Sequence, residues 1–491
     1  LEALKALMPY YQGKIKCIYI DPPYNTGNEG WVYNDKVNSP KIKKWLGKVV
    51  GGESEDLCRH DKWLCMMYPR LKLLRDLLSD NGIIFISIDD NEQSNLNLVI
   101  AEIFGEENII AQIVWKKKSG GGNAARFFAD DHEYILCCAK NKDMLKPFFV
   151  SLNEKDKEKY KMKDDFFEER GPFVIKNLTQ EGSLDERPNL RYEIKDPDGN
   201  PIKKEDGRFP QWRVEKKQFE KLLKEERIYF SKVKKKDGRT YYTVNTKQYL
   251  YEAVDDEGNP IFRKKKPRTI IDFVITGDSK QEMSELFGVR NHQDLPFTYA
   301  KPKDLIVHLI DIATQNDSIV LDSFAGSGTT AHAIIDLNAS DSGNRKFILI
   351  ELEDKVVKEV TLKKVKGAIK NVNNERGFEY CELDKPLFNE EGKIEEECSF
   401  EQLASYVYFT ETNTNIDKKA IEREFIGKYN ETDYYLIFKE KGNNFLNKSF
   451  LKGIKKECKN IIYADKCLID NKTLSKYNVQ FKQIPYEVKI Y

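Results

Sequence analysis

The sequence predicts an α/β protein built on a doubly wound, mostly parallel sheet. Two observations predict this fold. Short apolar runs alternate with segments of helical periodicity in residues 1–150 and again from about residue 299, and such alternation is typical of parallel sheets covered by helices on both faces. Between these stretches, charged residues and turn signals dominate, which indicates an inserted α+β domain.

In the first stretch, four apolar runs are expected strands and one longer segment is an expected helix. The strands are predicted at residues 15–20, 83–88, 109–115 and 134–139. Residues 61–80 carry leucine and methionine at helical spacing, and Asn81-Gly82 is expected to end that helix.

Later elements complete the same pattern. Residues 318–322 and 347–351 are expected strands, and residues 329–338 are an expected helix between them. After about residue 385 the chain becomes Lys-rich and mixed, which indicates a small C-terminal domain. The predicted domains are 1–150 and 291–384 as the two halves of one core, 151–290 as the insert, and 385–491 as the C-terminal domain.

Composition excludes some classes of protein. The 81 Lys and Arg nearly balance the 80 Asp and Glu, so any contact with nucleic acid must come from local basic patches. The nine cysteines form no CxxC pair and no zinc spacing, which indicates a reducing cytoplasm and no metal site. No apolar run reaches the ~18 residues of a membrane span. Because the chain begins with Leu1, an upstream segment is expected to be missing.

The tetrapeptide Asp21-Pro22-Pro23-Tyr24 directly follows the first expected strand. Ligands of open α/β sheets bind at the carboxyl ends of strands, and proline carbonyls remain available as acceptors. The Asp21 carboxylate and Pro22 carbonyl would grip both protons of an aromatic amino group and favour its nucleophilic, pyramidal form. Tyr24 would stack on a base that has left the double helix. The alternative is an ordinary strand-to-turn connection.

A glycine-rich turn follows the strand at 318–322 and opens the helix at 329–338. It reads Phe324-Ala325-Gly326-Ser327-Gly328-Thr329 after Asp322. Glycines allow close approach of a ligand to the backbone, and the helix start would attract an anion such as the carboxylate of a methionine moiety. Glu351 ends the next strand and would accept hydrogen bonds from ribose hydroxyls. A phosphate-binding P-loop would need Lys where Gly328 stands, and a purely structural turn is the other alternative.

The two motifs together resemble the β-class amino-methyltransferases, in which a DPPY-type catalytic motif precedes an FxGxG cofactor motif. The resemblance covers about residues 10–360. It is strongest to the modification subunits of type III restriction-modification systems, which carry runs such as Asp21–Asn28 and Arg59–Leu64. It also identifies residues 297–302 as a cofactor-flanking motif, although Lys301 is alternatively a solvated residue before a turn.

The resemblance implies a cytoplasmic enzyme that methylates N6 of adenine at specific sites in double-stranded DNA. The implied cofactor is S-adenosylmethionine. The implied partners are a second copy of the chain and a separate helicase-nuclease restriction subunit, with no metal and no membrane. The expected catalytic residues are Asp21, Pro22, Pro23 and Tyr24, and the expected cofactor residues are Lys301, Asp322, Phe324, Ala325, Gly326, Ser327, Gly328, Thr329 and Glu351. An adenine target is expected because related cytosine enzymes usually have Ser in place of Asp21.

The insert occupies the place of the family's target-recognition domain. It contains two basic runs beside aromatic residues, a combination suited to phosphate contact and base stacking. The candidate DNA contacts are Lys234, Lys235, Lys236, Arg263, Lys264 and Lys265, and a solvated charged face is the alternative for either run. Gly120-Gly121-Gly122 is either a loop that orders over DNA or a plain connection.

Two other functions stay open on the sequence alone. The same fold would suit another planar amino group, namely cytosine N4, an RNA base or a glutamine amide. A non-catalytic DNA-binding subunit is the second alternative, and the intact Asp21 and Tyr24 argue against it. The methyltransferase interpretation depends on one geometric expectation, that the proline turn and the glycine turn lie at the same pocket.

Overall fold

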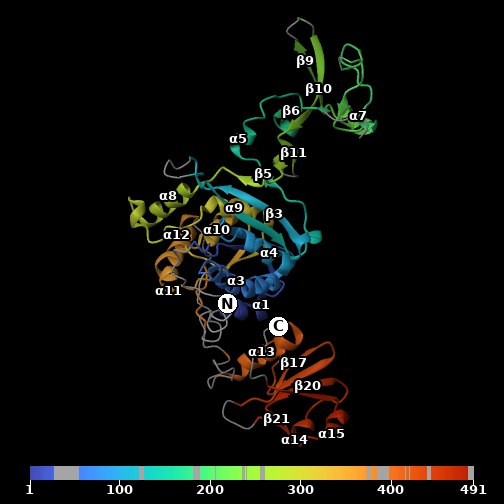
Figure 1. Cartoon of the computed structure of the whole chain (residues 1–491). Coiled ribbons are helices and arrows are strands. Elements are labelled where there is room, and N and C mark those ends of the chain that lie inside the picture. Colours follow the sequence, from blue (N-terminus) through green and yellow to red (C-terminus); the bar gives the residue numbers. More distant parts are fainter. Residues whose placement is uncertain are drawn as a thin grey trace. The chain divides into compact units, whose positions relative to one another are not determined.

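The computed structural model of the chain (Figure 1) describes residues 1–26, 55–120, 127–180, 188–204, 206–234, 238, 240–254, 260–372, 377–383, 387, 398–414, 416–417, 419, 421–439 and 444–484. The chain divides into two compact units. One comprises Leu1–Lys146 with Arg268–Tyr491, and the other comprises Pro147–Pro267. Within the described residues, no helix is long and apolar enough to cross a bilayer.

The first unit contains a seven-stranded sheet in the order β14-β3-β4-β2-β1-β15-β16. The strands are β1 (Ile15–Ile20), β2 (Leu78–Ile88), β3 (Ile109–Lys116), β4 (His132–Ala139), β14 (Ile270–Ile271), β15 (Ile319–Asp322) and β16 (Lys346–Leu349). Strand β4 runs antiparallel to both of its neighbours, and every other pair in this sheet is parallel. The sheet is therefore mostly parallel, and the predicted α/β fold class is confirmed.

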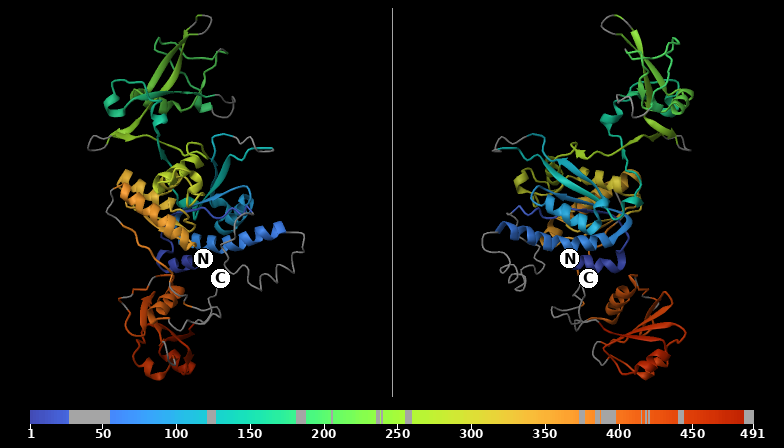
Figure 2. Two further views of the ribbon diagram at one scale, coloured as in Figure 1. Left: turned by 90° about the vertical axis from the view of Figure 1, so that its left-hand side faces the viewer. Right: turned by 45° about the vertical axis from the view of Figure 1, so that its right-hand side comes forward.

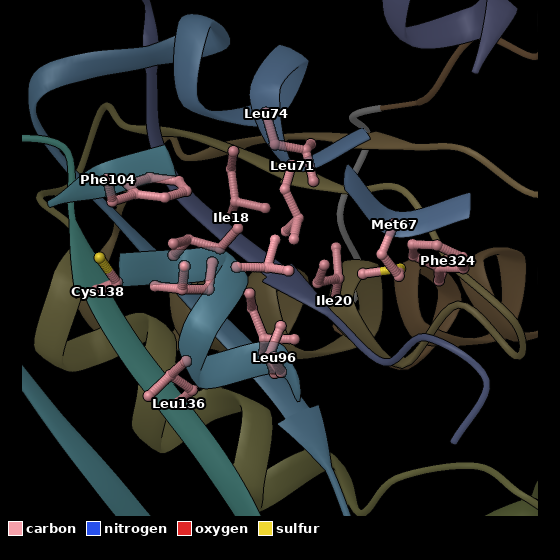
Figure 3. Packing of buried hydrophobic residues seen from close by; sticks show 14 of the residues in the cluster. Ile18, Ile20, Met67, Leu71, Leu74, Leu96, Phe104, Leu136, Cys138 and Phe324 are labelled. Atoms are coloured by element: carbon pink, nitrogen blue, oxygen red, sulfur yellow. The ribbon is translucent and has the colours of Figure 1, made fainter. Parts of the chain in front are cut away.

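Helices cover both faces of this sheet (Figures 1 and 2). The helices of this part of the unit are α1 (Glu2–Tyr11), α3 (Glu55–Leu77), α4 (Gln93–Phe104), α8 (Thr276–Phe287), α9 (Lys303–Ala313), α10 (Thr329–Asp341), α11 (Asp354–Val356) and α12 (Leu362–Asn371). Among them, α3, α4, α9 and α10 contact the strands of the sheet directly. In β1, Ile18 and Ile20 pack against α3 and α4 (Figure 3), while Cys17 and Tyr19 are buried on the opposite face. A strand buried on both faces needs an almost continuous apolar sequence, which is why residues 15–20 were recognisable.

The expected helix at 61–80 ends earlier than its periodicity indicates. Helix α3 stops at Leu77, because Leu78 pairs with Ile15 in the sheet and already belongs to β2. Pro69 lies inside the helix without ending it. Tertiary pairing thus overrides the local stop signal at Asn81-Gly82. Helices α8 and α9 were not predicted at all.

Strands β1 and β15 are parallel neighbours although about three hundred residues separate them in the sequence. Cys17 pairs with Val320, and Ile18 pairs with Leu321. Because parallel strands end at the same edge of a sheet, the turns after both strands lie together there. Strand β4 is antiparallel to β2 and therefore begins at this same edge.

The second unit is an α+β domain with its own small core of Leu178, Ile194, Trp212, Phe219, Ile228 and Val244. Its main sheet is antiparallel, in the order β6 (Phe173–Asn177), β10 (Thr240–Tyr249), β9 (Ile228–Lys234). The other elements are β5 (Val150–Ser151), α5 (Glu154–Lys157), α6 (Phe167–Arg170), β7 (Thr179–Gln180), β8 (Gln211–Trp212), α7 (Lys216–Lys224), β11 (Tyr251–Val254), β12 (Pro260–Phe262) and β13 (Lys264–Lys265).

The end of this unit differs from the expected insert boundary at residue 290. The unit closes at Pro267, because β13 pairs with β5 at its two ends and the chain then enters β14. There Ile270 pairs with Val114 of β3 in the sheet of the first unit. Composition placed the boundary near residue 290, although residues 268–290, which include the apolar residues Ile270, Ile271, Phe273 and Val274, belong to the larger unit.

The C-terminal segment forms a four-stranded sheet in the order β17 (Phe425–Tyr429), β18 (Thr432–Leu436), β20 (Lys459–Ala464), β22 (Val479–Gln483). The remaining elements are α13 (Phe400–Thr412), β19 (Phe445–Leu446), α14 (Lys448–Leu451), β21 (Lys466–Cys467) and α15 (Asn471–Lys476). Apolar clusters lie on both faces of this sheet, and Tyr434 and Tyr435 face opposite clusters.

Candidate active site

Four side chains from three distant segments meet at the edge of the sheet where β1 and β15 end. The Lys301 ammonium donates to both oxygens of Asp21 at 2.8 Å each. The Tyr24 hydroxyl lies 2.9 Å from Asp21 Oδ1 and 3.0 Å from Glu133 Oε2, so that its single proton is shared between these two carboxylate oxygens. Lys301 Nζ also lies 3.5 Å from Glu133 Oε2. The cluster thus joins the residues after β1, the start of β4 and the residues before α9.

Burial and charge determine the protonation of this cluster. Burial raises the pKa of Asp21, and the Lys301 ammonium opposes that shift without cancelling it. Burial alone would lower the pKa of Lys301, but the carboxylates of Asp21 and Glu133 outweigh it and raise that pKa. Burial and Asp21 together keep the pKa of Tyr24 well above its usual value. Tyr24 and Lys301 therefore remain protonated donors.

The proline turn is held by α3 through a hydrogen bond to its backbone. The Trp63 indole, fully buried, donates from Nε1 to the Pro23 carbonyl at 2.8 Å. In the part of the chain that the structure describes, no hydrogen bond occupies the Pro22 carbonyl. The acceptor that the sequence analysis singled out, Pro22, is thus left for a ligand, while its neighbour anchors the turn.

Asn25 fixes the end of the same turn. It adopts a left-handed conformation with φ of 61°, which asparagine tolerates better than most residues. Its side-chain amide donates to the fully buried Glu92 and, at 3.2 Å, to the Arg59 carbonyl. His60 Nδ1 lies 2.6 Å from Glu92 Oε1. The segment from Arg59 to Trp63 therefore supports the turn directly.

The glycine turn between β15 and α10 is closed by side chains on both sides. Asp322 accepts from the Phe324 amide at 3.0 Å and from Thr330 Oγ1 at 2.5 Å. The Gly326 amide donates to Glu351 Oε2 at 2.7 Å. Burial raises the pKa of Asp322 to about 7, and the nearby Asp21 adds to this.

Both glycines of this turn have conformations that other residues rarely adopt. Gly326 has φ of 48° and Gly328 φ of 79°. A Cβ atom at Gly326 would lie 3.2 Å from the Phe297 ring, and one at Gly328 would lie 3.0 Å from Thr361 Cγ2. The turn therefore needs glycine for its backbone angles and for its close packing.

The remaining predicted cofactor residues are held in place by contacts with their surroundings. Phe324 is buried and packs beside Met67 in the main core (Figure 3). The Ala325 amide donates to the Ile350 carbonyl at 3.0 Å. Ser327 is buried, and its hydroxyl lies 2.9 Å from Thr329 Oγ1.

Lys301 connects the two turns. Its ammonium binds Asp21, while its carbonyl accepts from Thr329 Oγ1 at 3.3 Å. Helix α9, which follows Lys301, packs against β1 and β2 and so fixes this position. The structure thus brings the proline turn and the glycine turn together, as the sequence predicts, and it places the Lys301 side chain in the proline turn.

Sequence reasoning missed three supporting residues. Glu133 contacts Tyr24 and Lys301 from β4, an element without any motif. Glu92 binds the proline turn from the start of α4. Lys364, almost fully buried on α12, donates to Thr329 Oγ1 at 2.8 Å, and burial lowers its pKa to about 8. Only Lys364 left a signal in the sequence, because it is a charged residue at helical spacing from the apolar Val360 and Ala368.

A cavity of about 470 Å³ adjoins the cluster, and its wall carries Glu133 together with Lys117, Lys118 and Lys280. Gly120 also lines this cavity, whereas Gly121 and Gly122 lie outside the described residues. Within the described residues, no three His, Cys, Asp or Glu side chains are arranged to hold a metal ion.

The candidate DNA contacts in the second unit have different surroundings. Lys265 pairs with Asp156, and Arg263 Nε donates to the Tyr249 carbonyl at 3.0 Å. Lys264 and Lys234 are exposed, at the start of β13 and the end of β9. Lys235 and Lys236 lie outside the described residues. Two of the described candidates thus have structural partners, and two face solvent.

The sequence of this chain is similar to a family of DNA methylases and to several characterised restriction-modification proteins. The model of a family described as DNA methylase matches residues 15–362. The Mod subunit of the type III restriction-modification enzyme EcoPI from Escherichia phage P1 is 33% identical over 380 residues, covering 73% of this chain and 57% of that protein. The StyLTI Mod subunit from Salmonella typhimurium is 34% identical over 388 residues, covering 77% and 55%.

The type II methyltransferase M.KpnI from Klebsiella pneumoniae is 30% identical over 365 residues, covering 73% of this chain and 80% of that protein. The chain spans somewhat more than half the length of the two Mod subunits. The family match includes the proline turn, the β4 segment and the glycine turn of the site described above. This chain therefore belongs to the DNA methylase family.

Proposed function

We propose that this chain transfers a methyl group from S-adenosylmethionine to N6 of adenine within specific sites of duplex DNA. The observation that carries this proposal is the meeting of the Asp21 carboxylate with the glycine turn at one edge of the sheet, bridged by Lys301. An acceptor for an amino group and a cradle for a cofactor thus share one site. The relatives named above are restriction-modification methyltransferases, which favours DNA as the substrate.

The glycine turn fits the cofactor. Its two left-handed glycines leave room for a ligand against the backbone, and the start of α10 offers amide groups to a carboxylate. Glu351 follows β16 and would accept hydrogen bonds from the ribose hydroxyls in place of backbone amides. When bound, the cofactor supplies an electrophilic methyl group on a sulfonium centre.

The proline turn supplies the chemistry at the adenine. Asp21 and the Pro22 carbonyl accept the two amino protons, so that the nitrogen lone pair is directed at the methyl group. When the methyl group leaves the sulfonium sulfur, which would become a neutral thioether, and bonds to the amino nitrogen, that nitrogen would become cationic and would have to lose one proton. Asp21 can hold that proton, because burial raises its pKa, before water removes it. Tyr24 lies beside Asp21, where it would stack on the flipped base.

DNA binding uses basic residues of both units. Lys117, Lys118 and Lys280 line the cavity beside Glu133, where ammonium groups suit the phosphates that flank a flipped nucleotide. The unit Pro147–Pro267 acts as the target-recognition domain, and Lys264 and Lys234 are its phosphate contacts. The chain acts as the modification subunit of a restriction-modification system, pairs with a second copy, and serves a separate restriction subunit in the cytoplasm.

The test uses Asp21→Ala and Asp21→Asn. Both variants should bind the labelled cofactor normally but transfer methyl to duplex DNA at least ~100-fold more slowly, the usual minimum effect of a positioned catalytic group. RNA of the same sequence should accept no methyl from the wild-type protein. Single-molecule sequencing of DNA from a host that expresses the chain should show N6-methyladenine in one sequence context. Methyl on RNA or on cytosine N4, or full activity of Asp21→Ala, would overturn the assignment.

A further inference from the structure

Glu133 occupies a position in the catalytic cluster that no motif explains. It lies at the start of β4, and its side chain is only 14% exposed. One carboxylate oxygen accepts from Tyr24 at 3.0 Å and lies 3.5 Å from Lys301 Nζ. The other oxygen lies 3.5 Å from Lys117 Nζ. Glu133 is therefore the only described carboxylate besides Asp21 that contacts both Tyr24 and Lys301.

The substrate amino group and the Lys301 ammonium compete for the same acceptor. Lys301 binds both oxygens of Asp21 at 2.8 Å, so an amine that binds this carboxylate competes with the ammonium and weakens its hold on at least one oxygen. A buried ammonium that loses its carboxylate is strongly unfavourable. Lys301 thus needs a second acceptor within reach, and Glu133 Oε2 lies in that position.

We propose that Glu133 is a positioning residue that takes over the Lys301 ammonium, and keeps the Tyr24 hydroxyl in place, when the substrate amino group binds Asp21. This inference rests on the proposed function and deepens it. No bond is made or broken in this step. One ammonium moves between two carboxylates, the amine takes the vacated oxygen, and the charge of the cluster is unchanged.

The variant Glu133→Gln keeps the size of the side chain and removes its charge. At saturating DNA and cofactor, kcat should fall at least ~10-fold, the rate equivalent of losing one charge-assisted hydrogen bond. Cofactor affinity should stay within about twofold of wild type, because Glu133 contacts no part of the glycine turn. Glu133→Asp keeps the charge and should recover part of the lost kcat.

The pH profile separates positioning from a purely structural role. The Glu133 carboxylate raises the pKa of both Asp21 and Lys301, so its removal lowers both pKa values. The acidic and the basic limbs of the kcat profile should therefore both move to lower pH in Glu133→Gln, and both should stay in place in Glu133→Asp. A residue that merely stabilises β4 would move neither limb.

Asp130→Asn is the matched control, because Asp130 pairs with Lys117 on the same connection and is 63% exposed. It should retain wild-type kcat and its wild-type pH profile. A second measurement uses the pair Lys301→Ala and Glu133→Gln. If Glu133 acts through Lys301, the double variant should be no more than about twofold slower than Lys301→Ala alone.

Additive losses, or unshifted limbs in Glu133→Gln, would overturn the inference about Glu133 while Asp21→Ala remains inactive. If Glu133→Gln does not fold, the same comparison is made with Glu133→Asp. Losses of kcat in Glu133→Asp and Lys301→Ala that add up in the double variant would overturn the inference, and losses that do not add up would support it. Failure of the wild-type protein to methylate DNA would instead overturn the proposed function. The two failures are thus distinguishable in one set of assays.

Discussion

At the scale of single residues, Lys301 and Gly328 show how the two turns are made into one site. Lys301 offers its ammonium to Asp21 and its carbonyl to Thr329, so neither turn can shift without the other. Gly328 lies directly before Thr329 and caps α10 in a left-handed conformation. The cofactor turn therefore depends on a backbone shape that only glycine adopts without strain.

Gly328→Ala tests this dependence. The left-handed conformation costs an L-residue about 1–2 kcal/mol, and the new Cβ would lie 3.0 Å from Thr361 Cγ2. We expect the turn to rearrange and the affinity for S-adenosylmethionine to fall roughly 10-fold, as measured by titration calorimetry.

The control for this change is Gly199→Ala in the second unit. Gly199 has φ of 84° with nothing within 4 Å of a Cβ atom. The Gly199→Ala variant should lose about as much folding stability as Gly328→Ala, but it should bind the cofactor as tightly as the wild-type protein. Equal cofactor affinity in both variants would contradict the role of the glycine turn.

At the scale of elements, helix α3 acts as the support of the proline turn. Trp63 binds the Pro23 carbonyl, and the Arg59 carbonyl accepts from Asn25. The same helix buries Met67, Leu71 and Leu74 against β1, so the turn is held by an element that the core itself fixes. A loop alone would hold the acceptors of the site less rigidly.

Trp63→Phe removes the hydrogen bond and keeps an aromatic ring. The Pro23 carbonyl would lose its donor in a buried setting, which costs about 1–3 kcal/mol. We expect the free energy of unfolding to fall by that amount and kcat to fall with it, because the turn that carries Asp21 loosens.

Trp212→Phe provides the comparison in the second unit. Trp212 is equally buried and donates to the Tyr192 carbonyl at 2.8 Å. It should lose comparable stability but retain kcat at saturating DNA. Chemical denaturation and methyl-transfer rates measure both quantities, and an equal loss of kcat in the two variants would contradict the support role of α3.

At the scale of the whole molecule, the candidate active site and the insert belong to different compact units. The sheet of the first unit carries the candidate catalytic and cofactor residues, and the compact unit Pro147–Pro267 interrupts it in the sequence. That unit has its own apolar core. A separately folded insert can change its surface without disturbing the catalytic edge, which suits a domain that selects target sequences.

Lys264→Ala and Lys265→Ala distinguish a DNA contact from a structural pair. Lys264 is exposed, so its removal should weaken the binding of DNA of any sequence. The slope of the logarithm of the binding constant against the logarithm of the salt concentration should fall by the amount expected for about one phosphate contact. Lys265 pairs with Asp156, so its removal should leave the salt dependence unchanged and lower stability by at most ~1 kcal/mol. Binding measured over a range of salt concentrations checks both, and identical slopes would contradict the assignment of Lys264.

Local patterns in the sequence were sufficient to predict the main strands, the two turns and the family. A doubly buried strand leaves an apolar run, and a special turn leaves proline or glycine, so each of these features is encoded by neighbouring residues. Residues 15–24 and 318–329 could therefore be interpreted from the amino-acid sequence alone. The compact unit ends at Pro267 and not at the expected residue 290, an expectation that depended on composition alone.

The contacts between side chains of the site followed from the tertiary arrangement instead. Glu133 joins the cluster because β4 is antiparallel to β2 and begins where β1 ends. Lys301 reaches Asp21 because α9 packs on β1 and β2. The order and direction of strands depend on contacts between residues far apart in the chain, and no local pattern of apolar residues or turns encodes them.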